Sequence, residues 1–442
     1  MNRKPERNRA DVLSKIFFFV YNVFFVPLFF VLVHFAGLFH HKLKRGLKGR
    51  KGLFEKCEQY FSHVPFNKRR IWLHISSLGE FEQAKPVIDE IRSRIPDVQI
   101  ILSLFSPSAY DNIHIRDEHI FVTYIPIDIY WHVKRFIEII KPDIAITVRH
   151  DIWPNFQWYL KKKNITTLLI DASITDKRKN LYRIFRIPIG NVIGTFSRIL
   201  TVSEQSSKRY QMLIHGAKGI QIAGDTRYDR VKQRSENNQK IGHLLNSGYF
   251  NRKTTFVAGS TWPSDEKILL PGIADTMGRF PALTVIIAPH EPTEEHLTQI
   301  ELFLENRKIK SIRYSELDKK TNRDFKVLLI DGIGLLANLY ALGGLAYVGG
   351  GMGPGVHNVL EPAAHGCAVL FGPRNTVSIE PRLLSEYGGG KIIETETDVV
   401  EYLNMLFTEP QSVQTIGERA KDFILSNTGA SRKIVDIIEN YL

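Results

Sequence analysis

The densest group of residues suited to chemistry lies in residues 349–362. Five glycines fall within residues 349–355, directly after the apolar run 345–348, and Asn358 and Glu361 follow three residues apart. Glycine lets a backbone come close to a ligand, and the start of a helix offers free N–H groups and a positive dipole to a phosphate. A carboxylate one turn into that helix is well placed to accept hydrogen bonds from ribose hydroxyls. The stretch therefore predicts a site for a nucleotide-linked sugar, and the alternative is a glycine-rich loop with a helix cap.

Two acidic side chains follow apolar runs in a similar way. Glu80 comes shortly after the run 71–75, and Asp151 comes shortly after the run 144–148. A carboxylate in such a place can accept the proton of an attacking hydroxyl. The alternative for Glu80 is a cap of the first helical turn, and the alternative for Asp151 is an N-cap network ahead of Pro154. Position alone leaves both hypotheses open for each residue.

The second half of the chain offers further polar groups after apolar runs. Ser260 and Thr261 follow the run 255–258 and suit phosphate oxygens, although such a turn is also a common helix cap. His290 and His296 are six residues apart, whereas a spacing of four puts two histidines on one helical face, so no zinc site is predicted. The chain has no Asp-x-Asp pair, the usual clamp for a metal-bound diphosphate. A metal-free transfer is therefore favoured, in which helix dipoles and basic side chains stabilise a leaving phosphate.

A regular alternation of strands and helices must position these groups. Apolar runs predict buried strands at 71–75, 98–104, 144–148, 167–170 and 199–202, and again at 255–258, 284–288, 327–330, 345–348 and 368–371. The intervals have helical spacing, for example at 82–95, 130–140 and 153–163. Strands that are apolar on both faces and separated by helices indicate parallel α/β sheets. The polar interval 230–253 interrupts this rhythm, so we expect two Rossmann-like domains that bind their ligand at the carboxyl ends of both sheets.

Composition narrows the class of protein further. The chain has 442 residues, enough for two domains with a core each. Its two cysteines, Cys57 and Cys367, argue against a disulfide scaffold and against a cysteine zinc site. Of the net charge of +13, residues 1–56 carry +9, with twelve Lys and Arg against three Asp and Glu. A nucleic-acid-binding protein is expected to spread basic charge over its folded surface, so no nucleic-acid partner is predicted.

Between the basic flanks, residues 16–39 contain no formally charged side chain. A helix of this length spans about 36 Å, which is enough to cross a bilayer with some tilt. The heavier basic cluster follows the apolar run, so the bulk of the protein is predicted on the cytoplasmic side. The alternative is an interfacial hairpin or amphipathic helix that residues 42–56 hold on anionic lipid. Both hypotheses place the chain on a membrane surface.

In this order and spacing, the motifs resemble those of the 3-deoxy-D-manno-octulosonic acid (Kdo) transferases of lipopolysaccharide synthesis. That family has the GT-B fold, in which two Rossmann-like domains face each other across a cleft. The resemblance runs from about residue 70 to about residue 430 and is carried by the short segments 77–80, 151–155, 224–229, 259–261, 357–363 and 371–373. The expected parts are a membrane anchor, an acceptor-binding domain, a nucleotide-sugar-binding domain and a C-terminal helix, at 1–56, 57–235, 250–430 and 431–442.

The resemblance implies an inverting, metal-independent transferase without a cofactor. It implies CMP-Kdo as donor, a lipid A precursor (lipid IVA) as acceptor, and a place on the cytoplasmic side of the bacterial inner membrane. Glu80 matches the general base of the family, and Asp151 and Arg227 match positions assigned to transition-state stabilisation. Together with Ser260 and Thr261, the donor contacts are then Pro289, His290, Ile333, Gly334, Leu335, Asn358, Val359, Leu360 and Glu361.

Several positions depart from the family pattern. His290 stands where arginine is usual, and Arg149 and Asp151 stand where two glutamates are usual. Leu335 replaces a glutamate, and Val356 replaces a glycine. Two other hypotheses therefore stay open: a membrane-associated GT-B transferase that uses another nucleotide sugar, and an inactive membrane scaffold that retains the fold.

Overall fold

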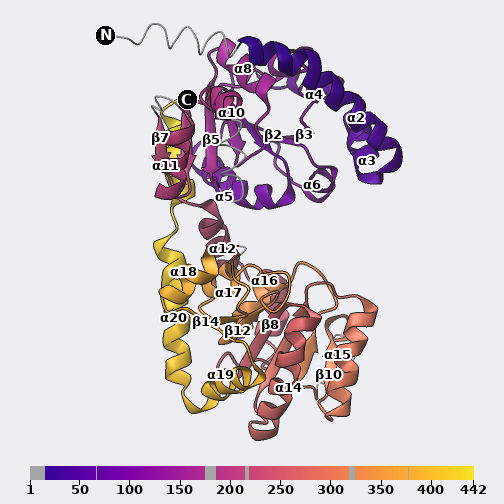
Figure 1. The fold of residues 1–442 in the computed structure, drawn as a ribbon, viewed down its shortest axis with the longest axis vertical. Coiled ribbons are helices and arrows are strands. Elements are labelled where there is room, and N and C mark those ends of the chain that lie inside the picture. Colours follow the sequence, from indigo (N-terminus) through magenta and orange to yellow (C-terminus); the bar gives the residue numbers. More distant parts are fainter. Residues whose placement is uncertain (1–14, 66, 175–185, 215–218, 318–323, 377) are drawn as a thin grey trace. The chain divides into compact units, whose positions relative to one another are not determined.

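The computed structural model of the protein describes residues 15–65, 67–174, 186–214, 219–317, 324–376 and 378–442. The chain forms two compact units (Figure 1). The first consists of Met1–Arg230 and Gly429–Leu442, and the second of Val231–Thr428. Each unit is built around one seven-stranded sheet in which all neighbouring strands are parallel.

The sheet of the first unit has the order β3-β2-β1-β4-β5-β6-β7. Its strands are β1 (Arg70–Ile75), β2 (Gln99–Leu104), β3 (Ile120–Tyr124), β4 (Ile144–Val148), β5 (Thr166–Ala172), β6 (Arg198–Thr201) and β7 (Ile220–Ile222). The helices before and between them are η1 (Tyr21–Phe25), α2 (Val26–Phe39), α3 (His41–Gly49), α4 (Leu53–Phe61), α5 (Leu78–Arg94), α6 (Pro107–Asn112), α7 (Tyr130–Ile140), α8 (Pro154–Lys162), α10 (Arg186–Ile193), α11 (Glu204–Leu213) and α12 (Thr226–Glu236).

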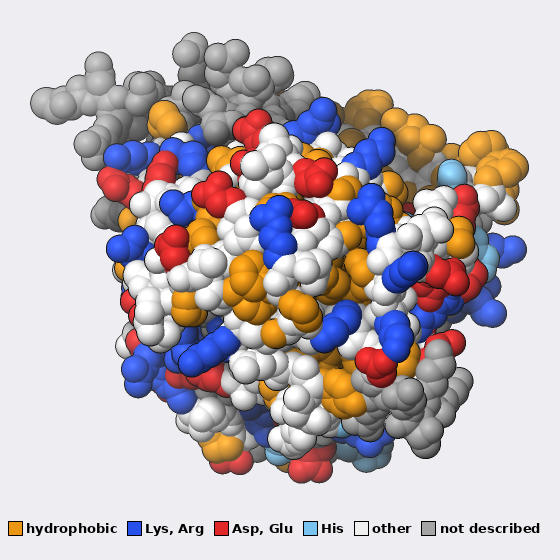
Figure 2. All heavy atoms as spheres, turned by 90° about the horizontal axis from the view of Figure 1, so that it is seen from below, with side chains coloured by type: hydrophobic (Ala, Val, Ile, Leu, Met, Phe, Trp, Pro, Cys, Tyr) orange, Lys and Arg blue, Asp and Glu red, His pale blue; other side chains and the backbone are white. Residues whose placement is uncertain are grey.

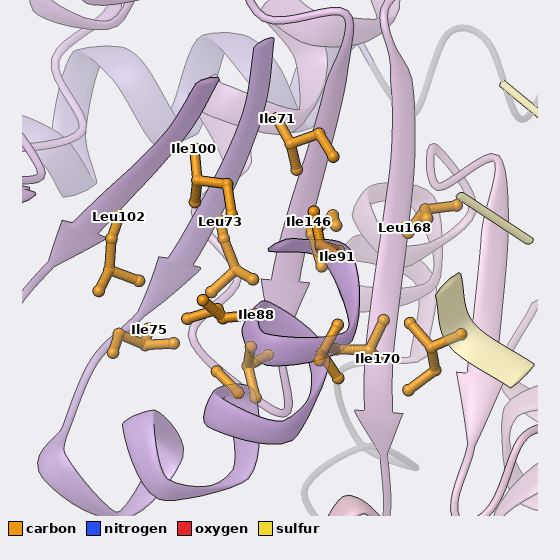
Figure 3. Packing of buried hydrophobic residues seen from close by; sticks show 14 of the residues in the cluster. Ile71, Leu73, Ile75, Ile88, Ile91, Ile100, Leu102, Ile146, Leu168 and Ile170 are labelled. Atoms are coloured by element: carbon orange, nitrogen blue, oxygen red, sulfur yellow. The ribbon is translucent and has the colours of Figure 1, made fainter. Parts of the chain in front are cut away.

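Both faces of this sheet are buried because successive side chains of a strand point to opposite sides. On one face, Leu73 of β1 packs with Ile88 and Ile91 of α5 (Figure 3). On the other face, Trp72 packs with Phe136 of α7 and with residues of α4 and α8. This double burial explains why the central strands are apolar along their whole length.

The second unit repeats the design with the order β10-β11-β9-β8-β12-β13-β14. Its strands are β8 (Thr255–Thr261), β9 (Thr284–Pro289), β10 (Ser311–Arg313), β11 (Val327–Leu329), β12 (Leu345–Val348), β13 (Ala368–Phe371) and β14 (Gly390–Ile392). Its helices are η2 (Gln239–Ile241), α13 (Gly242–Leu245), α14 (Pro263–Arg279), α15 (Glu294–Asn306), η3 (Tyr314–Glu316), α16 (Leu336–Leu339), η4 (Tyr340–Leu342), α17 (Leu360–Ala364), α18 (Glu380–Glu386), α19 (Glu396–Thr408) and α20 (Pro410–Ser426).

The ten strands predicted from apolar runs are all present, and the prediction of two parallel α/β sheets is confirmed. The four strands that were not predicted are β3, β7, β10 and β14, which are the edge strands of the two sheets. An edge strand has one neighbour and a more open face, so its residues need not be uniformly apolar. In β7, for example, Gln221 and Ile222 are exposed.

The last helix, α21 (Ala430–Glu439), returns to the first unit and packs against α5. Arg94 of α5 donates to Asp436 at 2.7 Å and also pairs with Glu439. Residues 431–442, which the sequence suggested as a separate C-terminal helix, are thus part of the first unit, although the chain reaches them only after completing the second.

The surface has one unusual feature, at the start of the described chain. The helix Lys15–Phe39 is long and apolar enough, by length and composition, to cross a membrane. On the face drawn in Figure 2, Lys and Arg side chains are interspersed with Asp, Glu and uncharged ones.

Candidate functional site

Glu80 lies in the first turn of α5, just beyond the carboxyl end of β1. Its Oε2 accepts hydrogen bonds from the backbone N–H of Ser76 at 2.6 Å and from the Ser76 hydroxyl at 2.7 Å. The hydroxyl of Ser77 caps the helix by accepting from the Glu80 N–H at 3.3 Å. Glu80 thus belongs to a helix start, and the bonds from Ser76 fix the orientation of its carboxylate, while its role as a base stays a prediction.

Asp151 ends a chain of hydrogen bonds that begins inside the sheet. Its Oδ2 lies 2.9 Å from Nε2 of His74 on β1. Nδ1 of His74 lies 2.9 Å from Oγ of Ser103, which accepts from the indole N–H of Trp72 at 2.8 Å. An ionised carboxylate only accepts hydrogen bonds, so His74 donates to Asp151 from Nε2. A side chain from the neighbouring strand thus positions Asp151.

A third cluster surrounds Asp171, which lies in β5. Asp171 accepts from the backbone N–H of Thr226 at 3.0 Å and from its hydroxyl at 2.6 Å. Arg227 donates to both carboxylate oxygens of Asp225, with Nη2–Oδ2 at 2.7 Å. Burial, and then the charge of Asp225, raises the pKa of Asp171 to about 7. Burial also acts to raise the pKa of Asp225, but Arg227, with help from Arg149, holds that pKa below its ordinary value.

In the second unit, one buried carboxylate organises the glycine-rich segment after β12. Asp265 of α14 is fully buried. Its Oδ2 accepts from the backbone N–H groups of Trp262 (2.9 Å) and Gly350 (2.7 Å). Its Oδ1 accepts from the N–H of Met352 (3.1 Å) and the hydroxyl of Tyr347 (2.8 Å). Four donors on one side chain fix the path of the glycine-rich segment.

The glycines of this segment serve contacts between backbones. A Cβ on Gly349 would lie 2.0 Å from the carbonyl oxygen of Ser260, and a Cβ on Gly351 would lie 2.4 Å from the backbone nitrogen of Gly372. Gly350 has φ of 91°, which favours glycine. Close approach was the expected role of these glycines, and the close approach found in the structure is to other parts of the same unit.

Three aromatic rings lie together beside this segment. The ring of His290 stacks on Trp262 with 4.8 Å between centroids and on His357 with 4.3 Å. The indole N–H of Trp262 donates to Nε2 of His357 at 2.8 Å. Burial, and then the charge of His290, lowers the pKa of His357. A neutral His357 is therefore favoured, which is the form that can accept this hydrogen bond.

The two predicted phosphate contacts after β8 differ in their surroundings. Thr261 is fully buried and its hydroxyl donates to Glu266 at 2.7 Å, whereas Ser260 is half-buried with φ of 54°. His296 lies 2.8 Å from Glu266 through Nε2, so these side chains satisfy one another. Within the part of the chain that the structure describes, no group of three or more His, Cys, Asp or Glu side chains could hold a metal ion.

Asn358 and Glu361 take the places expected at a helix start. The Oδ1 of Asn358 accepts from the N–H of Leu360 at 3.1 Å, immediately before the short helix α17. Glu361 lies in the first turn of α17 and pairs with Arg234 of α12 at 3.2 Å. The helix is only five residues long, so it begins and ends within little more than one turn.

The remaining predicted donor contacts lie where β9 and β11 end and beside α17. Pro289 is the last residue of β9, and Val359 is buried just before α17. Ile333 is 92% exposed, and Gly334 has φ of 89°. Leu335 is the residue before α16. These positions stay predictions as donor contacts.

Sequence reasoning did not identify His74, Asp171, Trp262 and Asp265 as parts of these clusters. A weak signal existed for His74, which is a polar residue inside an otherwise apolar run, and for Asp265, which follows Trp262 at the spacing of a helix cap. The ring stack had no such signal, because it depends on contacts between segments far apart in the sequence.

Comparison with known proteins supports the fold first. The structure is similar to the UDP-N-acetylglucosamine 2-epimerase of Neisseria meningitidis, with 13% identity, 84% of this chain and 100% of that chain covered, and a TM-score of 0.60. It is also similar to a glycosyltransferase from Rickettsia africae, with 13% identity, 85% and 98% coverage, and a TM-score of 0.52. With its two parallel sheets in separate units, the protein is of the GT-B-like class.

The family follows from sequence. Residues 46–230 match the family model described as 3-deoxy-D-manno-octulosonic-acid transferase (kdotransferase). The 3-deoxy-D-manno-octulosonic acid transferase of Haemophilus influenzae is 25% identical over 377 residues, which is 84% of this chain and 87% of that protein. The transferase of the same name from Chlamydophila psittaci is 25% identical over 407 residues, 90% of each chain. The chain belongs to the Kdo transferase family and is thus a glycosyltransferase.

Replacing Asp265 by asparagine tests the organisation of the glycine-rich segment. Each carboxylate oxygen accepts two hydrogen bonds, and an amide keeps only one of those oxygens. The Tyr347 hydroxyl can turn and accept from the amide, but at least one backbone N–H then faces an N–H group and loses its acceptor. We expect Asp265→Asn to lower the free energy of unfolding by about 2–4 kcal/mol. Amide hydrogen exchange in residues 349–353 should also become faster, as mass spectrometry can measure.

The matched control is Asp275→Asn on the same helix. Asp275 is exposed and pairs with Arg279 one turn away, so we expect an effect of less than about 0.5 kcal/mol. Unchanged exchange in residues 349–353 of Asp265→Asn would show that the segment is held by other contacts.

The raised pKa of Asp171 predicts a pH dependence of stability. The folded carboxyl binds its proton more tightly than the unfolded one, so its contribution to stability is present below pH 4 and is lost as the pH rises through about 7. An asparagine at position 171 can keep both hydrogen bonds to Thr226. Its amide oxygen accepts from the Thr226 N–H, and its amide nitrogen donates to the Thr226 hydroxyl oxygen once that hydroxyl has turned. The free energy of unfolding of Asp171→Asn minus that of wild type should therefore be higher at pH 8 than at pH 4.5, by at least ~1 kcal/mol. Urea unfolding at the two pH values measures this, and equal pH dependence in both proteins would contradict it.

Proposed function

We propose that this chain transfers Kdo from CMP-Kdo to a lipid A precursor, lipid IVA, with inversion at the anomeric carbon and without a metal ion. The observation that carries the proposal is the carboxylate of Glu80, held in one orientation by Ser76 at the carboxyl end of β1, in a chain that belongs to the Kdo transferase family.

Glu80 acts in this proposal as the general base. The acceptor hydroxyl attacks the anomeric carbon of Kdo, its proton passes to Glu80, and the bond from that carbon to the phosphate breaks as CMP leaves. Because the two bonds from Ser76 both go to Oε2, they orient the carboxylate without supplying a competing charge. A base that is already oriented loses less entropy when the reaction begins.

Asp151 and Arg227 stabilise the charges that develop in the transition state. The sugar centre becomes cation-like, which favours a nearby carboxylate, as in glycosidases. The family usually has the longer glutamate where Asp151 stands, and the bond from His74 gives the shorter side chain a fixed position. Arg227 serves the departing phosphate, and its pairing with Asp225 positions the guanidinium before the donor binds.

We assign the donor to the second unit. Glu361, which Arg234 holds, accepts from the ribose hydroxyls, and Ser260 with the backbone near Asn358 contacts the phosphate. His290 contributes a ring stacked on Trp262 where the family usually has a fixed positive charge. The site consequently depends more on backbone N–H groups for the phosphate. CMP leaves with a single phosphate, which needs less charge compensation than a diphosphate.

We place the enzyme on the cytoplasmic side of the bacterial inner membrane. The support is the apolar helix Lys15–Phe39 and the charge of +9 in residues 1–56. A lipid acceptor resides in the membrane, so an enzyme held there meets it without extracting it.

Replacing Glu80 by glutamine tests the role of the base. The amide is close in shape but cannot take up the proton, so we expect transfer to fall by at least about 100-fold. Binding of CMP-Kdo should stay within about twofold of wild type. Kdo addition is counted by mass spectrometry of the lipid product, and donor binding is measured by calorimetry.

Glu90→Gln is the matched control, since Glu90 lies on the same helix and pairs with Arg94. It should leave transfer near wild type. If Glu80→Gln turned over at a rate near wild type, Glu80 could not be the base.

The nucleotide and the metal are tested with the intact protein. Calorimetry should show binding of CMP and CMP-Kdo at concentrations where UDP and UDP-sugars give no heat. Transfer from CMP-Kdo should be unchanged in excess EDTA. Preference for UDP would favour the hypothesis of another nucleotide sugar, absence of any nucleotide binding would favour the inactive scaffold, and loss of transfer in EDTA would overturn metal independence.

A further inference from the structure

The apolar helix Lys15–Phe39 is bound along one side to the first unit. The hydroxyl of Tyr21 donates to Oδ2 of the buried Asp128 at 2.8 Å. The amides of Asn22 and Asn155 exchange two hydrogen bonds, of 3.0 and 2.9 Å. Asp128 also accepts from the backbone N–H of Asn155 at 3.0 Å. These four residues, here called the helix lock, join the first half of the helix to the start of α8.

The helix departs from regular α-helical geometry at the helix lock. Residues Tyr21–Phe25 make one π-turn, η1, inside the otherwise α-helical segment. Such a turn contains one extra residue and shifts the faces of the helix. Next to the lock, the rings of Phe17 and Phe18 contact Trp158 of α8, with centroids 5.7 and 5.0 Å apart. The contacts are thus both polar and aromatic, as in an ordinary helix–helix interface.

The chain beyond this helix is also bound to the first unit. His40 is extended, and α3 folds back on α2 at Gly37, where a Cβ would lie 2.9 Å from Leu47. After α3, the guanidinium of Arg50 donates to the carbonyl oxygens of Ile125 (2.8 Å) and Phe105 (3.0 Å). Residues in the first half of the apolar helix and Arg50 after α3 are therefore held by the same folded unit, and in Figure 1 the helix begins near α8.

This attachment is incompatible with a helix that crosses the membrane. The ends of a crossing helix lie on opposite sides of a hydrocarbon layer about 30 Å thick. Tyr21 and Arg50 contact the same unit, so a crossing would have to break the helix lock. It would also leave the amide of Asn22 in hydrocarbon without its partner, which is unfavourable.

The opposite side of the helix is apolar and exposed. The exposed large side chains of the helix are Ile16, Phe19, Val20, Val23, Phe24, Phe25, Leu28, Phe30, Val31, Leu32, Phe35, Leu38 and Phe39. Phe24 is 63% exposed and Leu38 is 71% exposed. A continuous apolar stripe of this size is too large for a surface in water. The adjoining α3 presents the exposed lysines Lys42, Lys44 and Lys48, which suit anionic headgroups.

We propose that Lys15–Phe39 lies in the plane of the membrane interface as part of the first unit, with its apolar stripe in the acyl chains and the lysines of α3 on anionic lipid. The inference rests on the membrane location proposed above and not on the sugar that is transferred. Asn155 of the helix lock is four residues from Asp151, so the helix is bound to the segment that directly follows this acid.

Sidedness of labelling tests the proposal in bacterial spheroplasts that carry the full-length protein. The native thiols of Cys57 and Cys367 are buried, so single cysteines are added at Asn8→Cys, before the helix, and at Glu401→Cys, on the exposed face of α19. A membrane-impermeant maleimide should label both cysteines only after lysis, with less than a tenth of that labelling in intact spheroplasts. Labelling of Asn8→Cys in intact cells would mean that the helix crosses the membrane and would overturn the proposal.

Depth measurements provide a second and independent test. Nitroxide labels at Val20→Cys, Phe24→Cys, Val31→Cys and Leu38→Cys, in vesicles of phosphatidylethanolamine and phosphatidylglycerol, should share one shallow depth of about 5–10 Å. A crossing helix would give a graded series with its maximum near the middle of the stretch. Vesicles of phosphatidylcholine alone should bind the protein at least several-fold more weakly, and equal binding would remove the role of the lysines. If the protein bound neither kind of vesicle, the membrane location itself would be refuted. That outcome differs from the graded series of depths that a crossing helix would give.

Discussion

Parallel strands end at the same edge of their sheet, and the residues to which we assign chemistry depend on this constraint. Glu80 follows β1, Asp151 follows β4, and Ser260 lies near the end of β8. A parallel sheet needs helices on both faces, so its polar groups can collect only where strands give way to loops. The apolar cores on either side of the sheet therefore determine where the reactive groups can lie, and the loops decide which groups they are.

Buried carboxylates then determine the shape of those loops. Asp265 collects the donors of the glycine-rich segment, Asp171 holds Thr226 beside Arg227, and Asp128 holds the start of α8. An ionised or partly ionised group inside a protein is costly unless several donors satisfy it. Each of these carboxylates has at least two, and their geometry is correspondingly specific. This explains how loops rich in glycine can still present a defined surface.

The sequence predicted the central strands well because burial on both faces leaves a continuous apolar signal. The edge strands β7, β10 and β14 have three residues each and include polar residues such as Gln221, so they lack that signal, whereas β3 (Ile120–Tyr124) is an apolar run that we did not predict as a strand. The residues of the candidate site divide in a similar way, into those that follow an apolar run and those that are joined only by tertiary contacts. Glu80 and Asp151 could be placed from the strands before them, whereas the bond from His74 to Asp151 and the rings around His290 depend on tertiary contacts. A single sequence does not contain those contacts in readable form.

The N-terminal helix shows the same limit at a larger scale. Its length and composition are compatible with both a crossing and an interfacial position, because neither property records what the helix touches. The partners that distinguish the two are Asp128 and Asn155, more than a hundred residues further along the chain. Tyr21 and Asn22 look like polar defects in an apolar run when the sequence is considered alone. In the folded unit they hold the helix against the domain, and in the interfacial position that we propose the apolar residues around them face lipid.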